Sequence, residues 1–158
     1  MNQKTIFITG SSRGIGKSIA LLFASHGYHT FLNCTRSLDA LKEVKETIET
    51  IYHMPCTLVP GDVGNPEDVA LIYQQIYQQC DCLDVLVNNA GIAHISLFTD
   101  MTDADWDRII QTNLSSVFYC CRAAIPPMVT RKSGRIINVS SMWGTSGASC
   151  EVAYSASK

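Results

Sequence analysis

The sequence predicts an α/β fold in which helices cover both faces of a parallel sheet. Short apolar segments alternate with longer stretches whose apolar residues recur at helical spacing. This alternation implies right-handed crossovers between parallel strands, and therefore a doubly wound sheet within one domain at residues 1–158. A glycine-rich turn directly follows the first apolar segment. Because doubly wound sheets bind ligands beyond the carboxyl ends of their strands, we expect the functional residues in those turns.

Five segments are predicted as strands because each is short, apolar and bounded by turn residues. The first contains three consecutive apolar residues, Ile6, Phe7 and Ile8, as expected of a strand that is buried on both faces. The five predicted strands are Lys4–Thr9, His29–Cys34, Cys56–Val59, Val85–Val87 and Arg135–Val139.

Helical patterns occupy the intervals between these strands. In the first helix, which is expected to end near Gly27, the apolar residues Ile15, Ile19, Leu22 and Phe23 fall on one face. Residues 65–68 predict the start of another helix, because a capping asparagine precedes a proline and two acids. The helices after the first are predicted at Leu38–Tyr52, from Asn65 to about Gln79, from the capping residue Thr102 onward, and at Asn113–Thr130 with a disturbance at Pro126 and Pro127.

The composition excludes several classes of protein. The 158 residues are 46% hydrophobic and 16% charged, and the net charge is −2. These values suit a globular domain with a sizeable core, and they provide no field that would recruit nucleic acid or an anionic membrane. No apolar run approaches the roughly 20 residues that span a bilayer. Residues 1–7 also lack the apolar region of a secretory signal, so we expect a cytoplasmic protein.

The seven cysteines are numerous for this length, but their arrangement indicates no disulfide framework. Their number is odd, the spacing Cys-x-x-Cys does not occur, and four of them lie in strand-like or helix-like segments. We interpret them as buried, reduced thiols. The four histidines also lack the spacing of metal ligands, so we predict no metal site.

The turn after the first predicted strand has the pattern Thr-Gly-x3-Gly-x-Gly at residues 9–16. Glycines permit a tight turn and let backbone N–H groups approach a pyrophosphate, whose charge the following helix N-terminus favours. The spacing differs from the general dinucleotide fingerprint Gly-x-Gly-x-x-Gly, but its place between a strand and a helix strengthens the signal. The residues of this turn that we expect to bind a dinucleotide are Gly10, Ser12, Arg13, Gly14, Ile15 and Gly16.

Further motifs follow this turn in a fixed order. Asn-Asn-Ala-Gly at residues 88–91 ends the fourth strand, Asn113 lies in a later helix, Ser141 follows the fifth strand, and Tyr154-x3-Lys158 comes last. Over the whole chain this ordered set resembles the short-chain dehydrogenase/reductase family, and within it the 3-oxoacyl-[acyl-carrier-protein] reductases most of all. The resemblance implies a Rossmann-like sheet and the NADP-linked reduction of a ketone to an alcohol.

The resemblance also implies catalytic roles for Ser141, Tyr154, Lys158 and Asn113. Tyr154 would give its phenolic proton to the carbonyl oxygen of the ketone. A free tyrosine has a pKa of about 10, and Lys158, on the same helical face, would lower it and bind the nicotinamide ribose. Ser141, thirteen residues before Tyr154 and preferred to Ser140, would donate to the substrate oxygen, and Asn113 would hold a water that links Lys158 to solvent.

Cofactor preference is expected to depend on the charge beside the ribose 2′ position. An acid after the second strand would accept from the 2′-hydroxyl of NAD and repel the 2′-phosphate of NADP. Between residues 33 and 38 there is no acid, and Arg36 with Arg13 is placed to clamp a phosphate. We therefore predict NADP(H), against the alternative that both arginines are solvated surface charges.

Other cofactor contacts follow from the resemblance alone. Asp62 and Val63 are similar to the family's adenine-contacting pair, with a simple turn aspartate as the alternative. Asn89 and Gly91 are expected to line the cofactor, as are Tyr154 and Lys158.

The substrate stays open between two branches of the family. One branch reduces 3-oxoacyl thioesters. The other reduces a 5-aminopentanone-modified lysine on translation elongation factor P, and residues 141–144 and 147–152 resemble that branch more closely. Trp143 is a candidate for a substrate contact, with a packing aromatic as the alternative. A third hypothesis is a non-catalytic or inactive dinucleotide-binding fragment.

Members of the resembling family continue well beyond the lysine that corresponds to Lys158. The resemblance therefore predicts a sheet that is incomplete at the C-terminus and lacks the last strands and the substrate loop. We expect a fragment with little turnover by itself and an exposed fifth strand. The full-length protein is expected to act on a small-molecule or carrier-bound ketone and to form homo-oligomers through the long helices beside the fifth strand.

Overall fold

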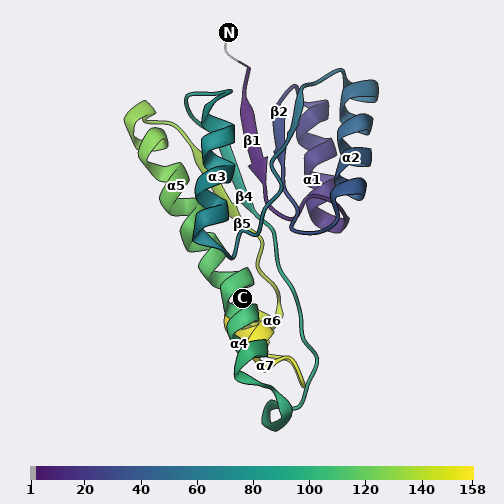
Figure 1. The fold of residues 1–158 in the computed structure, drawn as a ribbon, viewed down its shortest axis with the longest axis vertical. Helices are drawn as coiled ribbons and strands as arrows, with labels where there is room; N and C mark the ends of the chain where they lie inside the picture. Colours follow the sequence, from purple (N-terminus) through teal and green to yellow (C-terminus); the bar gives the residue numbers. More distant parts are fainter. Residues whose placement is uncertain (1–2) are drawn as a thin grey trace.

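The structure, a computed structural model, describes residues 3–158 and contains a five-stranded parallel sheet with strand order β3-β2-β1-β4-β5. Helices α1 (Gly14–Ser25) and α2 (Leu38–Thr47) lie on one side of the sheet, and α3 (Pro66–Tyr77) and α5 (Ser116–Arg131) lie on the other (Figure 1). The predicted doubly wound sheet is therefore confirmed. Its strands are β1 (Thr5–Ile8), β2 (His29–Leu32), β3 (Cys56–Leu58), β4 (Val85–Asn88) and β5 (Arg135–Asn138).

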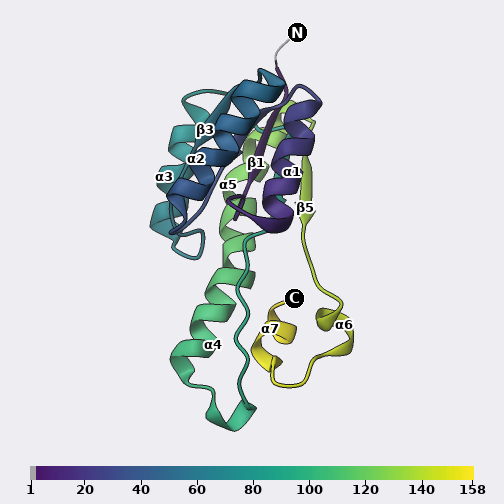
Figure 2. The same cartoon turned by 90° about the vertical axis from the view of Figure 1, so that its right-hand side faces the viewer.

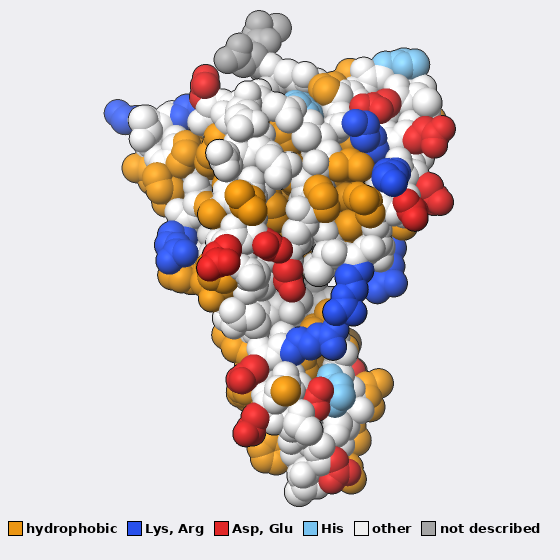
Figure 3. Space-filling view, in the orientation of Figure 1, with side chains coloured by type: hydrophobic (Ala, Val, Ile, Leu, Met, Phe, Trp, Pro, Cys, Tyr) orange, Lys and Arg blue, Asp and Glu red, His pale blue; other side chains and the backbone are white. Residues whose placement is uncertain are grey.

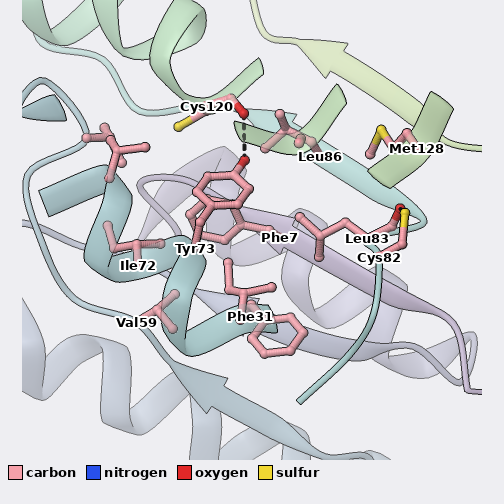
Figure 4. Close-up of a cluster of buried hydrophobic side chains, with 14 residues drawn as sticks. Phe7, Phe31, Val59, Ile72, Tyr73, Cys82, Leu83, Leu86, Cys120 and Met128 are labelled. Carbon is pink, nitrogen blue, oxygen red and sulfur yellow. Dashed lines mark hydrogen bonds between the residues drawn. The ribbon is translucent and has the colours of Figure 1, made fainter. Parts of the chain in front are cut away.

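Alternate residues of β1 enter two separate hydrophobic cores. Ile6 and Ile8 pack toward the layer formed by α1 and α2, whereas Phe7 packs toward α3 and α5. The register of the sheet places Phe31 of β2 and Leu86 of β4 beside Phe7 on the same face. Figure 4 shows these side chains converging on Tyr73 of α3, whose ring meets that of Phe7 edge to face at 5.6 Å. The continuous apolar run of the sequence thus reflects a strand buried on both faces.

The face of α1 that packs on the sheet differs from the predicted one. Ile15 and Leu22 are 63% and 56% exposed, whereas Gly16, Ala20 and Ala24 are buried. Small residues at this helical spacing let the helix axis approach the strands closely, and large side chains are displaced to the flanks of the contact. Ile15 and Leu22 on the predicted apolar face are therefore not part of the packed face, although the predicted helix is confirmed.

The start of α3 is as the sequence predicts. The side-chain oxygen of Asn65 accepts hydrogen bonds from the backbone N–H groups of Glu67 at 2.8 Å and Asp68 at 3.3 Å. Pro66 occupies the first helical position, where it has no donor to lose.

Two helices that the sequence predicts separately are joined in the structure. Helix α4 (Asp103–Ile110) continues through a π-helical turn at Gln111–Ser115 into α5 without a break. Thr102 begins α4 in a capping box with Asp105, as its spacing indicates. The π-helical turn inserts an extra residue in the helix and re-aims the side chains around Asn113.

The two prolines in α5 do not interrupt the helix, contrary to expectation. Proline has no N–H group, so Pro127 leaves the carbonyl oxygen of Ala123, four residues earlier, without its helical donor. The hydroxyl of Tyr77 in α3 donates to this oxygen at 3.1 Å. A side chain from the neighbouring helix thus replaces the missing backbone hydrogen bond.

A second group of elements lies beyond the carboxyl ends of the strands. Figures 1 and 2 show α4, α6 (Trp143–Ser146) and α7 (Val152–Ser157) gathered there, together with the long segment that follows β4. The segment after β4 and the segment before α7 meet in this group. The backbone N–H of Ser96 in the first donates to the carbonyl oxygen of Cys150 in the second at 2.9 Å. The residues that the sequence predicts to be functional are therefore concentrated at this end of the sheet.

Strand β5 lies at the edge of the sheet in the order of the described strands. Its Ile137 is 40% exposed, as expected of an edge strand. None of the helices in residues 3–158 combines the length and apolarity that crossing a membrane requires.

Candidate functional site

The glycine turn is shaped by close contacts between β1, α1 and β4. Gly10 has a φ of +63°, and a Cβ atom there would lie 2.9 Å from the Cα atom of Ala90. A Cβ atom at Gly16 would overlap the carbonyl oxygen of Gly10 and would lie 2.6 Å from Nδ2 of Asn89. Both positions therefore require glycine, because any larger residue would push the turn away from β4.

Helix α1 differs from α3 and α4 in having no side chain that caps its N-terminus. Its N-cap is Arg13, whose side chain makes no capping hydrogen bond, and its first turn contains no acid. The N–H groups of Gly14, Ile15 and Gly16 have no partner four residues earlier within the helix. A Cβ atom at Gly14 would meet nothing within 4 Å, so space remains beside this turn. The arrangement fits a phosphate group, whose charge these N–H groups and the helix dipole favour.

Asn89 braces the glycine turn from the end of β4. Its Nδ2 atom donates to the carbonyl oxygens of Thr9 and Gly10, each at 3.0 Å. The Thr9 hydroxyl in turn accepts from the backbone N–H groups of Asn89 and Ala90. Both side-chain N–H bonds of Asn89 are thereby used within the protein, so this side chain has no N–H group left to donate to a cofactor.

Asn33, directly after β2, also supports the glycine turn, a role that the sequence pattern did not predict. This buried residue accepts from Gly10 N at 3.4 Å through Oδ1 and donates through Nδ2 to the carbonyl oxygens of Val59 and Gly61. Its own carbonyl oxygen accepts from the backbone N–H of Ser11 at 2.8 Å. The signal that would have revealed it is a buried amide where an apolar strand ends, since such a group must find partners.

Arg13 and Arg36 follow neighbouring strands, because β1 and β2 pair through Ile8 and Leu32. Both arginines are exposed, and neither takes part in an ion pair within residues 3–158. Figure 3 shows basic side chains (blue) below α1 and α2, at the waist between the sheet layer and the lower group of helices. The carboxylate of Asp39 is bound by Lys42 at 3.0 Å, which reduces its repulsion of an anion.

The predicted adenine-contacting pair lies in the turn after β3. The carboxylate of Asp62 accepts from Gly64 N at 2.9 Å, and the side chain of Val63 is buried. Asp62 and Gly64 also border an open depression of about 280 Å³, whose other lining residues are Asn65, Pro66, Arg108, Gln111 and Thr112.

Lys158 lies between Tyr154 and the end of β5. Its Nζ atom is 5.8 Å from the centre of the Tyr154 ring and donates to the Val139 carbonyl oxygen at 3.1 Å. Burial lowers the pKa of the Lys158 ammonium. A Cβ atom at Gly91 would lie 3.1 Å from Nζ of Lys158 and 3.5 Å from Oδ1 of Asn113. The structure thus brings Gly91, Asn113 and Lys158 together, beside Tyr154.

Asn113 is buried in the π-helical turn and uses its amide within the protein. Its Oδ1 atom accepts from Ile92 N at 2.8 Å, and its Nδ2 atom donates to Ile92 O and to Ser157 Oγ, each at 2.9 Å. Both amide hydrogens are engaged, and one lone pair of Oδ1 remains for the predicted water. The contact to Ser157 was not foreseen from the sequence.

The two serines after β5 differ in how their hydroxyl groups are used. Ser140 donates to the carbonyl oxygen of Lys158 at 2.9 Å. Ser141 instead accepts from the backbone N–H of Trp143 at 3.2 Å, which leaves its hydroxyl hydrogen for another acceptor. Helix α6 follows Ser141 and packs against α7. The approach is so close that a Cβ atom at Gly144 of α6 would lie 2.7 Å from the carbonyl oxygen of Lys158.

These motifs occur together in a known family. The family model for short chain dehydrogenases matches residues 4–158. The chain belongs to the short-chain dehydrogenase family. Nearly all of its length, and with it the glycine turn and the Tyr154–Lys158 motif, therefore falls within the family pattern.

The chain is similar to curated bacterial proteins named as a reductase and an oxidoreductase. The 3-oxoacyl-[acyl-carrier-protein] reductase FabG of Staphylococcus aureus is 38% identical over 155 residues, which are 98% of this chain and 63% of that protein. The uncharacterized oxidoreductase YmfI of Bacillus subtilis is 35% identical over 156 residues, 99% of this chain and 63% of that one. The chain thus spans 63% of the length of both relatives.

The fold of this short-chain dehydrogenase is also similar to solved structures. A metagenomic short-chain oxidoreductase, crystallised in complex with NADP, superposes with a TM-score of 0.93 at 32% sequence identity. The match covers 98% of this chain and 70% of that one. The similarity confirms the Rossmann-like class of the sheet.

The cysteines of this short-chain dehydrogenase are all free. Burial raises the pKa of Cys120 to about 12 and that of Cys56 to about 11, so these thiols stay protonated near neutrality. Cys80, Cys121 and Cys150 are partly exposed, contrary to the interpretation that all seven are buried. In the part of the chain that the structure describes, no three His, Cys, Asp or Glu side chains are grouped as metal ligands.

Proposed function

We propose that this chain carries the cofactor-binding and catalytic residues of an NADPH-dependent reductase that converts a ketone to an alcohol. The observation that supports this most directly is the position of Lys158, whose ammonium is half-buried beside the Tyr154 ring, Gly91 and Asn113. A buried cation close to a phenol stabilises the phenolate and so assists proton transfer by the tyrosine.

Different residues would bind the cofactor and transfer the proton. The N–H groups of Gly14, Ile15 and Gly16 would hold the phosphates of NADPH, and Lys158 would donate to its nicotinamide ribose. NADPH, when bound, supplies the hydride. Tyr154 gives its phenolic proton to the ketone oxygen.

Two further residues complete this proton-transfer site. Ser141 donates its free hydroxyl hydrogen to the same ketone oxygen. A water on Oδ1 of Asn113 would then resupply the proton through Lys158.

The preference for NADPH over NADH forms part of the proposal. Two exposed arginines, Arg13 and Arg36, follow the paired strands β1 and β2 and would meet at the 2′-phosphate. The first acid that follows in the sequence, Asp39, is paired with Lys42. The NADP complex of the metagenomic relative is consistent with this preference.

A 3-oxoacyl thioester is the substrate that we favour, on a small molecule or on a carrier protein. The relatives named as 3-oxoacyl-[acyl-carrier-protein] reductases support it by similarity. Met142 and Val152, close in sequence to Ser141 and Tyr154, are 67% and 41% exposed. These apolar side chains offer a surface for the acyl chain, and a role in fatty acid biosynthesis would follow.

The second candidate is a ketone that carries an amine, such as a 5-aminopentanone-modified lysine of elongation factor P. The observation that favours it is Glu151, a partly buried acid at the N-cap of α7, three residues before Tyr154. Its carboxylate would attract the ammonium of such a substrate, whereas a neutral acyl chain gains nothing from it.

The proposal includes a homo-oligomer and a cytoplasmic location. Exposed apolar residues form a stripe along the continuous helix made of the π-helical turn at Gln111–Ser115 and α5. Contact between this stripe and a second copy of the chain would remove these residues from water. The free cysteines suit a reducing compartment. The residues of the stripe are Leu114, Phe118, Ile125 and Val129.

The test is consumption of NADPH by the purified full-length protein with an acetoacetyl thioester and, separately, with a 5-aminopentanone. We expect turnover with the thioester and a loss of at least about 100-fold in the Tyr154→Phe variant. A rate with the amine-bearing ketone that falls in Glu151→Gln would select the second substrate. Binding of NADPH without turnover of any ketone would instead indicate a non-catalytic dinucleotide-binding protein.

A further inference from the structure

Ser157 connects the π-helical turn to the helix that carries the catalytic tyrosine. The residue is 5% exposed. Its hydroxyl oxygen accepts from Nδ2 of Asn113 at 2.9 Å and its hydroxyl hydrogen is donated to the carbonyl oxygen of Tyr154 at 2.8 Å. Asn113 lies 44 residues earlier in the chain, so this contact joins distant segments.

The hydrogen bonds continue from Ser157 to the segment after β4. The amide of Asn113 both accepts from the N–H of Ile92 and donates to its carbonyl oxygen. A continuous chain of hydrogen bonds thus runs from Ile92 through Asn113 and Ser157 to Tyr154. Each polar group in it has a partner, and such fully paired buried networks hold one arrangement of the backbone.

Helix α7 depends on contacts of this kind. Its residues Val152–Ser157 lie beyond the carboxyl ends of the strands and pack against α4 and α6. The Lys158 N–H donates to the Ser155 carbonyl, three residues back, at 3.3 Å, while the Tyr154 carbonyl accepts the Ser157 hydroxyl. These two bonds are local. The helix is tied to distant segments by the Asn113 amide, which donates to Ser157, and by the Val139 carbonyl oxygen, which accepts from Lys158.

We propose that Ser157 is a positioning residue, whose hydroxyl aligns Tyr154 and Lys158 by fastening α7 to Asn113. This inference rests on the proposed function, because alignment matters only where Tyr154 transfers a proton. Ser157 itself touches neither substrate nor cofactor in this role. It acts through the backbone of Tyr154 and the amide of Asn113.

Ser155 provides a matched control within the same helix. Its hydroxyl oxygen is buried and has no hydrogen-bond partner among the described residues. The variants Ser155→Ala and Ser157→Ala each remove one buried hydroxyl from α7. Only the second removes hydrogen bonds, so any difference between them reports on those bonds.

The first measurement is the kinetics of ketone reduction by the two variants in the full protein. We expect kcat of Ser157→Ala to fall about 10-fold, which corresponds to about 1.4 kcal/mol, with KM and the Kd for NADPH changed by less than about 3-fold. Ser155→Ala should match the wild type. A purely structural role would lower the melting temperature or raise KM without this selective loss of kcat.

The second measurement is independent of activity and follows the side-chain amide of Asn113 by NMR. In Ser157→Ala one of its two N–H signals should shift and exchange faster with water, together with the signals of Tyr154 and Lys158. Ser155→Ala should leave all of them in place. Wild-type kcat in Ser157→Ala, or equal spectra for the two variants, would overturn the inference.

The two measurements separate this inference from the proposed function. If the wild-type protein reduces no ketone, the proposed function fails, and the NMR comparison alone judges whether Ser157 fastens α7. If the wild type is active and only Ser157→Ala loses kcat, both stand.

Discussion

The ammonium of Lys158 donates a hydrogen bond of 3.1 Å to the carbonyl oxygen of Val139, the first residue after β5. The contact fixes the charge beside the Tyr154 ring and joins α7 to the sheet. It also holds a cation in a partly buried place, where burial lowers its pKa. The proposed function requires the positive charge of Lys158, whereas burial of the side chain disfavours that charge in the folded protein.

The first prediction concerns the pH dependence of stability. The pKa of Lys158 is lowered in the folded state from an ordinary value of 10.5, so the unfolded chain binds more protons between the two values. The free energy of unfolding then rises with pH across that window, because the charge that burial disfavours is removed. We expect Lys158→Met to lack this contribution, which urea denaturation near neutral pH and at about pH 10 will measure. A pH dependence identical in both proteins would contradict the prediction.

The second prediction concerns Gly16. In Gly16→Ala the new methyl group would overlap the Gly10 carbonyl oxygen and crowd Nδ2 of Asn89, so the turn must move. We expect a loss of about 1–3 kcal/mol in the free energy of unfolding and weaker NADPH binding. Denaturation and fluorescence titration will measure the two effects. Ser18→Ala, at an exposed position of the same helix, is the control and should change neither.

The third prediction concerns Arg36 and the choice of cofactor. A guanidinium that binds the 2′-phosphate affects NADPH and leaves NADH unchanged, because only NADPH carries that phosphate. We expect Arg36→Ala to raise the Kd for NADPH about 10-fold, equivalent to about 1.4 kcal/mol. Calorimetric titration with both cofactors will measure this. Lys132→Ala, which removes a cation after α5, is the control and should leave both Kd values unchanged. An equal loss of affinity for NADPH and NADH in Arg36→Ala would contradict a contact between Arg36 and the 2′-phosphate.

The fourth prediction concerns the hydrogen bond between Tyr77 and the Ala123 carbonyl, which Pro127 leaves without a helical donor. Tyr77→Phe should lower the free energy of unfolding by about 1 kcal/mol. In a Pro127→Ala background the restored N–H can serve the same oxygen, so Tyr77→Phe should cost less. A double-mutant cycle will measure the difference, and strict additivity would refute the compensation.

Much of the fold was predictable because local patterns report burial. All five predicted strands occur in the structure. The continuous apolar runs of β1 and β4 reflect strands that are buried on both faces. The caps at Asn65 and Thr102 marked helix starts through their spacing alone. The packing face of α1 could not be predicted from the positions of its large apolar residues. The residues that are buried against the sheet, Gly16, Ala20 and Ala24, are small.

The candidate site was predicted from its motifs, and the structure shows the contacts between them. The sequence by itself determined the fold class, the order of the functional turns and the family resemblance, because these depend on residue types at fixed spacing. Only the tertiary structure decided that Asn33 joins the ends of three strands, that Val139 receives Lys158 and that Ser157 meets Asn113. Those contacts depend on distances between segments far apart in the chain, which packing sets and which spacing along the sequence does not encode.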